Sequence, residues 1–308
     1  MNSRNNTKSE NNFVHLHCHS GYSLLDGAVR IEQLIKGAQN NNMPAVALTD
    51  HGVLYGAIDF YRKAEEAGIK PIIGCEVYLT PGSRLEKNKN RYHLVLLAEN
   101  NEGYYNLVKI VSSAWLEGFY YKPRIDYELL KKYNEGIIAL SGCIQGEISQ
   151  LILNVRMKKA EEKISKYISI FGENNYYLEL QDHNLRKEKK VNSELIKLSN
   201  KMDVPLVVTN DVHYFNKEED DMHDILLAMQ TGKTVNDEDR LTFEGSEYYF
   251  KSGEEMKSLF PEIDSAYNNT LKIADRCGLN LDFESFYLPS YPDVREEETA
   301  SELLKNKC

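Results

Sequence analysis

Seven short apolar runs, each of strand length, constrain the fold of this chain more than any other feature. They are residues 13–17, 45–49, 71–79, 92–98, 136–142, 176–180 and 205–211. Several are apolar at successive positions, which is typical of strands covered on both faces by helices. None approaches the ~18 residues needed to span a bilayer, so the sequence argues against an integral membrane protein.

Segments with helical periodicity separate these runs. Apolar residues recur near one helical face in 29–39 and in 157–172, and 57–68 ends in a glycine that suits a helix C′ position. From about residue 216 the pattern is mostly helical. Repeated strand-then-helix units predict a parallel α/β fold with a helical C-terminal extension. The pattern leaves open whether the sheet is doubly wound or a closed barrel.

Composition narrows the class of protein. The 308 residues include five cysteines, an odd number that argues against a disulfide framework and favours a reducing, cytoplasmic setting. The net charge of −10 argues against a sequence-independent nucleic-acid coat, which needs a basic surface. It does not exclude a DNA enzyme, because bound divalent cations can reverse the local sign of charge.

The two ends differ from the rest of the chain. Residues 1–12 are polar and lack the apolar segment of a secretory signal, so we expect a disordered tail. LPSYPDV, near the other end, predicts a proline-marked connector, and the final stretch has the acidic start of a new helix. We therefore expect one domain over 13–285 and a connector over 286–308, within a longer natural protein.

Three histidines alternate in HLHCHS: His15, His17 and His19. On a strand, alternate residues share one face at steps of about 6.6–6.8 Å. Clustered imidazoles suit a divalent metal and repel one another when protonated. The alternative is a set of buried, hydrogen-bonded polar groups.

Other metal-competent side chains lie beside the ends of the apolar runs. They are Asp26, Asp50, His51, Glu76, His93, Cys143, Asp211 and His213. In α/β folds the loops at the carboxyl ends of the strands build the active site. His93 is the exception, since it lies near the start of its run. The mixture of imidazole, carboxylate and thiol favours zinc, with manganese or iron as alternatives.

A few residues of the same types fall outside this pattern. We interpret Asp182 and His183 as loop residues and His223 as a helix residue without a role in the site. Cys18 alternates with the histidines, so it and Cys277 are expected in the core.

The motifs FVHLHCHSGYSLLDGA, TDHG, GCEVYL, IIALSGC and VVTNDVHY resemble the polymerase-and-histidinol-phosphatase (PHP) domain of bacterial replicative DNA polymerase III alpha subunits. The resemblance covers about residues 13–292. It includes EGSEYYFKSGEEMKSLFPEIDSAYNNTLKIADRC and YLPSYP, which separate the polymerase branch from stand-alone PHP phosphatases. It implies a seven-stranded distorted (β/α) barrel, which resolves the choice left open above.

The resemblance also implies nine metal ligands around up to three divalent ions, with zinc or manganese favoured and iron or magnesium as alternatives. One ion would be held by His17, His19, Glu76 and Asp211, a second by Glu76, His93 and Cys143, and a third by Asp26, His51 and His213. His15 and Asp50 would orient these ligands rather than bind metal.

By the same resemblance, the expected activity is metal-dependent phosphoester hydrolysis, and in the polymerase setting 3′–5′ exonuclease proofreading of a DNA primer end. Partners would be the remainder of the polymerase chain with its palm domain, a sliding clamp and a proofreading subunit, with no membrane. No palm motif occurs in 293–308, so this chain alone is not expected to polymerise DNA. The alternatives are a non-catalytic scaffold that docks a proofreading subunit and a stand-alone phosphatase.

Overall fold

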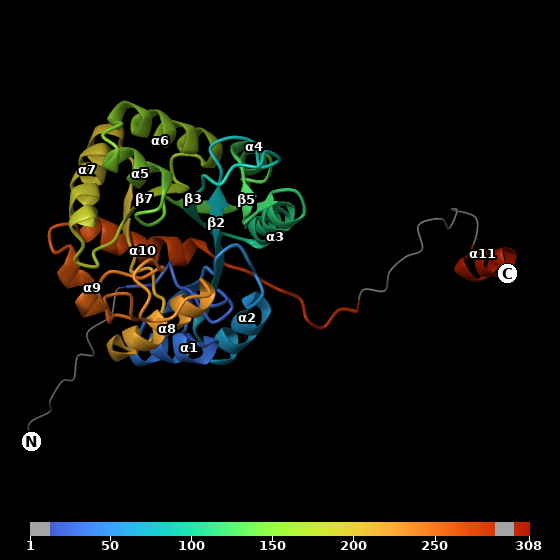
Figure 1. Cartoon of the computed structure of the whole chain (residues 1–308). Coiled ribbons are helices and arrows are strands. Elements are labelled where there is room, and N and C mark those ends of the chain that lie inside the picture. The colour runs from blue at the N-terminus through green and yellow to red at the C-terminus, as the bar shows by residue number, and fades with distance from the viewer. Residues whose placement is uncertain (1–12, 287–298) are drawn as a thin grey trace, which may run out of the picture.

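The computed structural model describes residues 13–286 and 299–308. Helices surround a strongly curled sheet (Figure 1). Neighbouring strands in the sheet follow the order β4-β5-β2-β3-β6-β7-β8, and β1 also pairs with β2. The strands are β1 (Ala45–Leu48), β2 (Lys70–Leu79), β3 (Tyr92–Ala98), β4 (Phe119–Tyr120), β5 (Lys122–Ile125), β6 (Ile137–Leu140), β7 (Tyr176–Leu180) and β8 (Leu206–Val208). Six of the seven predicted runs are therefore strands.

The first run, 13–17, closes the sheet into a distorted barrel without forming a regular strand. On one side the Ala47 N–H donates to the carbonyl of His15 at 2.8 Å, and on the other the Val212 N–H donates to the carbonyl of His17 at 3.1 Å. Residues 13–20 thus lie between β1 and the segment after β8. The predicted seven-stranded (β/α) barrel of the PHP type is confirmed.

The expected parallel arrangement does not hold for β3. β3 runs antiparallel to both β2 and β6. The connection between β2 and β3, residues 80–91, contains no helix. A parallel pair needs a long crossover, usually a helix, whereas a loop can join an antiparallel pair. The short hairpin β4–β5 was not predicted either.

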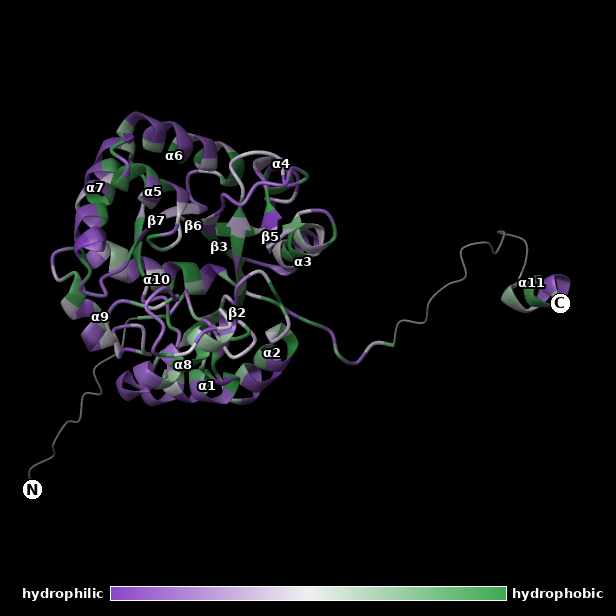
Figure 2. Cartoon of the chain, in the orientation of Figure 1, coloured by the Kyte–Doolittle hydropathy of each residue, from purple (hydrophilic) through white to green (hydrophobic). Residues whose placement is uncertain are grey.

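All the helices except α11 cover the outside of the barrel, and their polar faces point outward; α11 lies apart from it (Figure 2). They are α1 (Ile31–Asn40), α2 (Ala57–Glu66), α3 (Asn101–Leu116), α4 (Tyr127–Lys132), α5 (Glu147–Leu153), α6 (Met157–Phe171), α7 (Arg186–Met202), η1 (Lys217–Glu219), α8 (Asp220–Gln230), α9 (Gly253–Leu259), α10 (Asp264–Arg276) and α11 (Ala300–Lys307). The predicted helical extension is present as η1 and α8–α11. No helix in the described parts of the chain is long and apolar enough to cross a membrane.

Two apolar clusters form the core. The larger lies between the strands and the surrounding helices, and the smaller joins alternate residues of the strands, such as Ala45 and Ala47, to Ile273 and Cys277 at the end of α10. Alternation along a strand places these two sets on opposite faces. Cys18 lies in the larger cluster and Cys277 in the smaller. The tail 1–12 and the LPSYPDV connector lie outside the described residues, and the boundaries 13–285 and 286–308 stay predictions.

Candidate metal centre

Four buried side chains from three separate segments form the first group of candidate ligands. Their ligand atoms, on His17, His19, Glu76 and Asp211, all lie within 4.8 Å of one another. Asp211 Oδ1 lies 3.2 Å from His17 Nε2 and 3.1 Å from His19 Nε2. Glu76 comes from β2, the histidines from the segment 13–20, and Asp211 from just after β8. This is the set that the resemblance implied for one ion.

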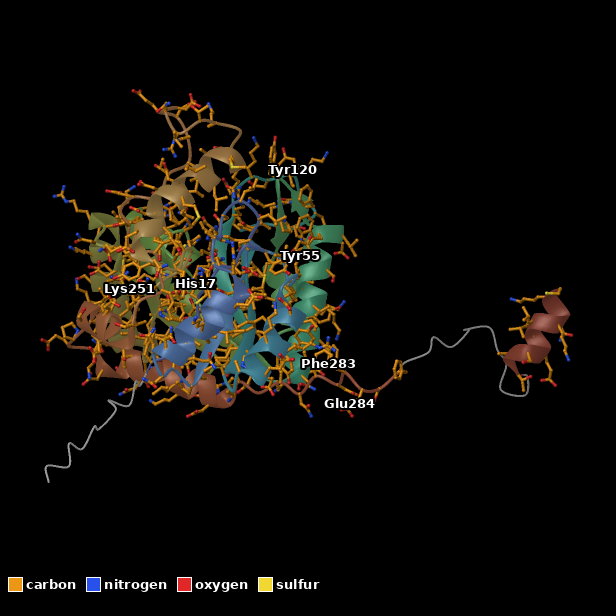
Figure 3. The ribbon with its side chains drawn as sticks, turned by 90° about the horizontal axis from the view of Figure 1, so that it is seen from below. His17, Tyr55, Tyr120, Lys251, Phe283 and Glu284 are labelled. Carbon is orange, nitrogen blue, oxygen red and sulfur yellow. The ribbon has the colours of Figure 1, made fainter. Side chains whose placement is uncertain are left out.

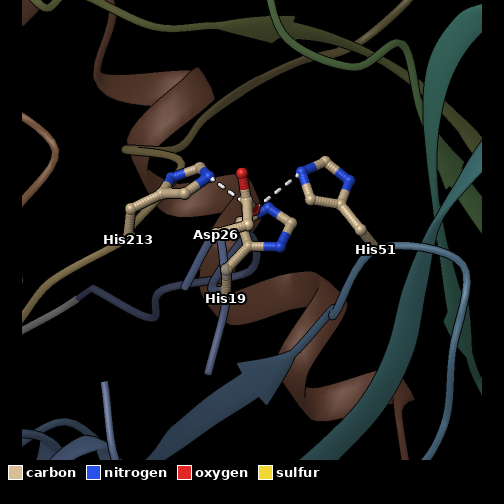
Figure 4. Close-up of side chains that lie close together, drawn as sticks. All are labelled: His19, Asp26, His51 and His213. Atoms are coloured by element: carbon tan, nitrogen blue, oxygen red, sulfur yellow. Dashed lines mark ion pairs between the residues drawn. The ribbon is translucent and has the colours of Figure 1, made fainter. Parts of the chain in front are cut away.

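A second group shares Asp26. Its Oδ2 lies 3.2 Å from His51 Nε2 and 3.3 Å from His213 Nε2. His19 belongs to this group as well, because its ligand atom lies within 4.8 Å of the others; its ring also stacks on that of His51, with centroids 4.2 Å apart (Figure 4). The predicted set lacked His19.

The third group contains His51, Glu76 and His93. Glu76 Oε1 lies 2.9 Å from His93 Nδ1, and Glu76 Oε2 lies 2.8 Å from His51 Nδ1. Cys143 Sγ lies 3.5 Å from His93 Nδ1 and 3.9 Å from Glu76 Oε1. All nine predicted ligands therefore gather at one end of the barrel. Cys143 lies beside the third group, and His51 takes the place in it that the prediction gave to the thiol.

The antiparallel direction of β3 explains the position of His93. His93 lies near the start of its strand, opposite Tyr78 at the end of β2. Because β3 is reversed, its beginning lies at the same rim as the carboxyl ends of the parallel strands. His93 is thus no exception to the rule that this rim carries the site.

Unsatisfied polar atoms concentrate in these groups. Among the described residues, ten buried side-chain N and O atoms have no hydrogen-bond partner, and seven belong to the candidate ligands. The seven are His17 Nε2, His19 Nε2, Asp26 Oδ2, His51 Nδ1, Glu76 Oε2, Asp211 Oδ1 and His213 Nε2. A buried polar atom without a partner costs about 1–3 kcal/mol. Imidazole nitrogens and carboxylate oxygens facing one another in this way fit divalent cations.

The electrostatics of the cluster follow from the same crowding. Burial alone would lower the pKa of His17, but neighbouring carboxylates, that of Asp211 foremost, hold it well above its ordinary value. Burial would raise the pKa of Glu76, yet His93 and His51 hold it well below its usual range. At the Cys143 thiol, burial and the Glu76 carboxylate act in the same direction, and both raise its pKa well above 9.0. Crowding thus favours the ionised form of Glu76 and the protonated form of His17.

Hydrogen bonds fix the orientation of the imidazoles. Glu179 Oε1 lies 2.7 Å from His17 Nδ1, and the carbonyl of Asp211 lies 2.7 Å from His213 Nδ1. Each contact leaves Nε2 facing the cluster. Sequence reasoning missed Glu179. The available signal was a carboxylate inside the apolar run of β7, where only a partnered charge is tolerated.

Asp50 acts on the site through a serine. Its Oδ1 accepts hydrogen bonds from the Ser20 N–H at 2.6 Å and from the Ser23 hydroxyl at 3.1 Å. Ser23 Oγ lies 3.2 Å from His19 Nδ1 and accepts the His51 N–H at 3.0 Å. Asp50 therefore has contacts suited to the orienting role predicted for it.

His15 lies apart from the cluster. Its Nε2 lies 2.8 Å from the carbonyl of Lys251, and its ring packs against Phe13 and Phe250. Burial lowers its pKa to about 4. None of these contacts is with a candidate ligand, so His15 lies outside the cluster that His17 and His19 enter.

His183 and His223, which the sequence placed outside the site, both have hydrogen-bond partners. His183 is a buried loop residue whose Nδ1 lies 2.6 Å from Glu188 Oε1. His223 is on α8, as predicted, but its Nε2 lies 2.8 Å from the carbonyl of Asp26. His223 is in none of the three ligand groups, but it supports the backbone of a candidate ligand.

Asp211 has an unusual backbone. Its φ of 47° lies in the left-handed region, which Asp and Asn tolerate better than most residues. The preceding residue is firmly held: Asn210 Nδ2 donates to the carbonyls of Glu247 and Tyr249, at 2.9 and 2.8 Å. These bonds fix the turn that directs Asp211 into the cluster.

A cavity of about 960 Å³ opens over the cluster. Its walls include the candidate ligands Asp26, His51, His93, Asp211 and His213. Ligand pockets in proteins span about 300–1,000 Å³. The candidate ligands are therefore accessible to a molecule larger than water.

Comparison with known proteins shows what this chain resembles. The sequence pattern of the PHP domain matches residues 15–183. The DNA polymerase III subunit alpha of Treponema pallidum is 46% identical over 299 residues, covering 96% of this chain and 26% of the relative. That of Borreliella burgdorferi is 46% identical over 300 residues, with the same coverage. The chain thus spans about a quarter of the length of these relatives. Among solved structures, an amidohydrolase from Chromobacterium violaceum matches with a TM-score of 0.45 and 14% identity, covering 65% of this chain and 87% of that chain.

Proposed function

The chain belongs to the PHP domain family, as its motifs predicted, and on that premise we propose that its metal centre hydrolyses phosphodiester bonds. Its relatives carry the name DNA polymerase III subunit alpha. We therefore propose DNA as the substrate, cleaved from the 3′ end of a primer. A mispaired end costs less to unpair, so it would reach a recessed site more readily.

The observation that carries this proposal is the convergence of seven unsatisfied, buried donor and acceptor atoms. Two or three divalent ions would satisfy them. Nitrogen and oxygen donors with one nearby thiol favour zinc or manganese. His17, His19, Glu76 and Asp211 would hold one ion, Asp26, His51 and His213 another, and Glu76, His93 and Cys143 a third. When bound, such ions generate a nucleophile from water near neutral pH and stabilise charge on a leaving oxygen.

The chain's own residues prepare the site for this chemistry. Glu179 Oε1 accepts a hydrogen bond from His17 Nδ1, so His17 Nε2 faces the cluster. The carbonyl of Asp211 does the same for His213. The depressed pKa of Asp26, which burial opposes and His51 and His213 bring about, keeps that carboxylate ionised. Ligands held in the correct orientation bind cations without prior reorganisation.

We assign DNA synthesis to another part of the polymerase alpha chain. Residues 293–308 contain no motif for the carboxylates that nucleotidyl transfer needs. We propose that the rest of a polymerase alpha chain supplies them, and that a sliding clamp and a proofreading subunit are further partners. A non-catalytic scaffold and a stand-alone phosphatase are the rival functions.

Metal content is the first test. We expect the purified chain, after gel filtration, to hold about two to three divalent ions by elemental analysis, because the ligands form three groups. Fewer than one ion per chain after reconstitution would favour the scaffold.

Activity is the second test. A labelled primer–template with a mismatched 3′ end is incubated with the manganese- or zinc-loaded chain, and with histidinol phosphate in a parallel reaction. We expect shortening of the primer, no extension, and little turnover of the small ester. Asp211→Asn should abolish shortening, because Asn suits the left-handed backbone but removes a charged ligand. Lys197→Gln, at an exposed position on α7, is the matched control. Equal shortening by wild type and Asp211→Asn would indicate a contaminating nuclease.

A further inference from the structure

One wall of the cavity carries cations and exposed aromatic rings, although the chain as a whole is acidic. We call Lys89, Arg91, Phe119, Tyr121 and Lys122 the aromatic–basic wall; all five line the cavity. Lys89 and Arg91 end the β2–β3 loop, and the other three belong to the hairpin β4–β5 and its turn. Phe119 is 54% exposed and Tyr121 is 63% exposed. Large exposed rings beside unburied cations are typical of a binding surface.

The cations of this wall have no acidic partner. Among the described residues, no carboxylate lies within 4.0 Å of the charged groups of Lys89, Arg91 or Lys122, whereas Arg84 in the same loop pairs with Asp126. The wall cations instead lie over rings: Lys89 Nζ is 4.4 Å from the ring centre of Tyr121. Their charge is therefore available to an anion in the cavity.

A buried arginine holds the two parts of the wall together. Arg124 Nη1 donates to the carbonyl of Asn88 at 2.7 Å and Nη2 to that of Arg84 at 2.8 Å, both in the loop. Its Nε donates to the carbonyl of Gly118 at 2.9 Å, at the base of the hairpin. Because one side chain joins the backbones of both segments, the wall is preorganised. Tyr120, which precedes Tyr121 in the chain, lies on the same side of the molecule as Tyr55 (Figure 3).

One ring, that of Tyr78, lies between two of the wall cations and the candidate ligands. Tyr78 stacks on His51, with centroids 5.6 Å apart and an angle of 12° between the planes, and meets His93 edge-on at 5.4 Å. Lys122 Nζ lies 5.4 Å and the Arg91 guanidinium 5.8 Å from the ring centre of the same tyrosine. An anion at the metal centre and a second anion at the wall could thus belong to one short chain.

Phe119 is linked through Trp115 to the loop that carries His51. Trp115 at the end of α3 stacks on Phe119, with centroids 5.3 Å apart. Its indole N–H donates to the carbonyl of Gly52, the residue after His51, at 2.8 Å. The position of the hairpin is therefore coupled to the backbone of a candidate ligand.

We propose that the aromatic–basic wall binds single-stranded nucleic acid and directs its terminal phosphodiester to the metal centre. Bases stack on Phe119 and Tyr121, and backbone phosphates contact Lys89, Arg91 and Lys122. Stacking rings beside a cationic track are the usual means of holding a single strand without sequence preference. The proposal rests on the proposed function, because it supplies the substrate for the same centre. Apart from the candidate ligands, the acidic residues that line the cavity are Glu244 and Glu188. Glu188 is hydrogen-bonded to His183.

Binding is measured by fluorescence anisotropy with a labelled ten-residue oligothymidylate whose phosphorothioate linkages resist cleavage. We expect Phe119→Leu, which keeps an apolar contact with Trp115, to weaken binding roughly tenfold, within the range for loss of one stacked base. Lys122→Gln should weaken it at low salt and reduce the slope of log affinity against log salt by about 0.7, the value for one phosphate contact of a single strand.

Matched controls lie outside the cavity. Tyr105→Ala removes a ring that is 56% exposed on α3, and Lys197→Gln removes an exposed charge on α7. Neither should alter oligothymidylate binding. An abasic strand and a duplex of equal length should bind at least tenfold more weakly than the single strand. Equal binding of the abasic and thymidylate strands, or equal losses in the wall and control variants, would overturn the proposal.

Kinetics separate this proposal from the proposed function. Bis(p-nitrophenyl) phosphate offers a phosphodiester to the metal centre but has no second phosphate for the wall. We expect Lys122→Gln to raise KM for an unmodified oligothymidylate several-fold more than KM for this ester. If wild type cleaves the ester and Lys122→Gln raises both KM values equally, the wall is overturned and the metal chemistry stands. If wild type cleaves neither substrate yet the anisotropy results hold, the hydrolytic function fails and the wall stands.

Discussion

At the scale of single residues, the orientation of each imidazole in the candidate centre depends on the hydrogen-bond partner of the ring nitrogen that faces away from the cluster. Glu179 is buried and lies 2.7 Å from His17 Nδ1. Glu179→Gln keeps the size of the side chain but removes the charge that fixes the His17 tautomer. We expect metal affinity to fall about 10–100-fold, which is typical for loss of such a partner. Competition with a chromogenic chelator measures this, and Glu161→Gln on the surface of α6 is the control. Unchanged affinity would show that Glu179 is only a packing residue.

His15 gives a pH-dependent prediction. Its folded pKa of about 4 lies below the unfolded value of 6.5, so the unfolded chain binds the proton more tightly. Stability from this residue is complete above pH 6.5 and falls as the pH drops from 6.5 through 4. The loss reaches about 2–3 kcal/mol at pH 4.5. His15→Leu should therefore unfold in urea with a shallower loss of stability between pH 6.5 and 4.5.

The slope with pH is the readout for His15, because the variant also leaves the carbonyl of Lys251 without its partner and is less stable at pH 7. Both proteins are compared after metal removal, so that ligand protonation contributes equally. Parallel pH curves for the two proteins would contradict the assignment of a buried, neutral His15.

Residue types near the runs were enough to find the candidate ligands, because the sequence shows which side chains follow each strand. The sequence was less able to show which of these ligands form each group. His19 and His51 each lie in two groups, and such sharing depends on ring rotation rather than on position in the chain. His15 is outside the groups because its ring contacts Phe13, Phe250 and the carbonyl of Lys251, and alternation along the chain does not reveal such partners.

At the scale of elements, the unpredicted feature is the direction of β3. An apolar run has the same pattern in either direction, so hydropathy located the strand without orienting it. The absence of helical periodicity in 80–91 was the usable signal. The hairpin β4–β5 is short and carries exposed rings, so no buried alternation marked it. The elements that build the aromatic–basic wall are thus the ones that the sequence predicted least well.

Close packing of α3 against the residue before β6 gives a prediction about a glycine. A Cβ on Gly103 in the first turn of α3 would lie 1.8 Å from the carbonyl oxygen of Gly136. Alanine is the better helix former, yet Gly103→Ala should destabilise the protein by about 1–3 kcal/mol, because the backbones must move apart. Urea unfolding measures this. Gly278→Ala meets nothing within 4 Å and should change stability little. A Gly103→Ala variant as stable as wild type would show that α3 can shift freely.

At the scale of the whole molecule, the candidate centre joins segments that are far apart in sequence. The barrel is closed by residues 13–20 and by the turn at 209–214, and both carry candidate ligands. Neither forms a regular strand in the described residues. Closure through irregular backbone is weaker than a full ladder of hydrogen bonds, so cations bound at this seam would add much of its strength.

Chelation should therefore destabilise the protein in a localised and pH-dependent way. Ligand that binds only the folded state adds about 2.7 kcal/mol at 100 times its Kd, so we expect a lower Tm in EDTA once the metal is shown to be gone. Amide hydrogen exchange should increase first in 13–20 and 209–214, and α6 serves as the internal reference. Protons compete with the metal for His17, whose pKa is raised. The Tm difference between loaded and stripped protein should consequently widen from pH 6 to pH 8. An equal difference at both pH values, or uniform loss of protection, would contradict an ion held by these histidines at the seam.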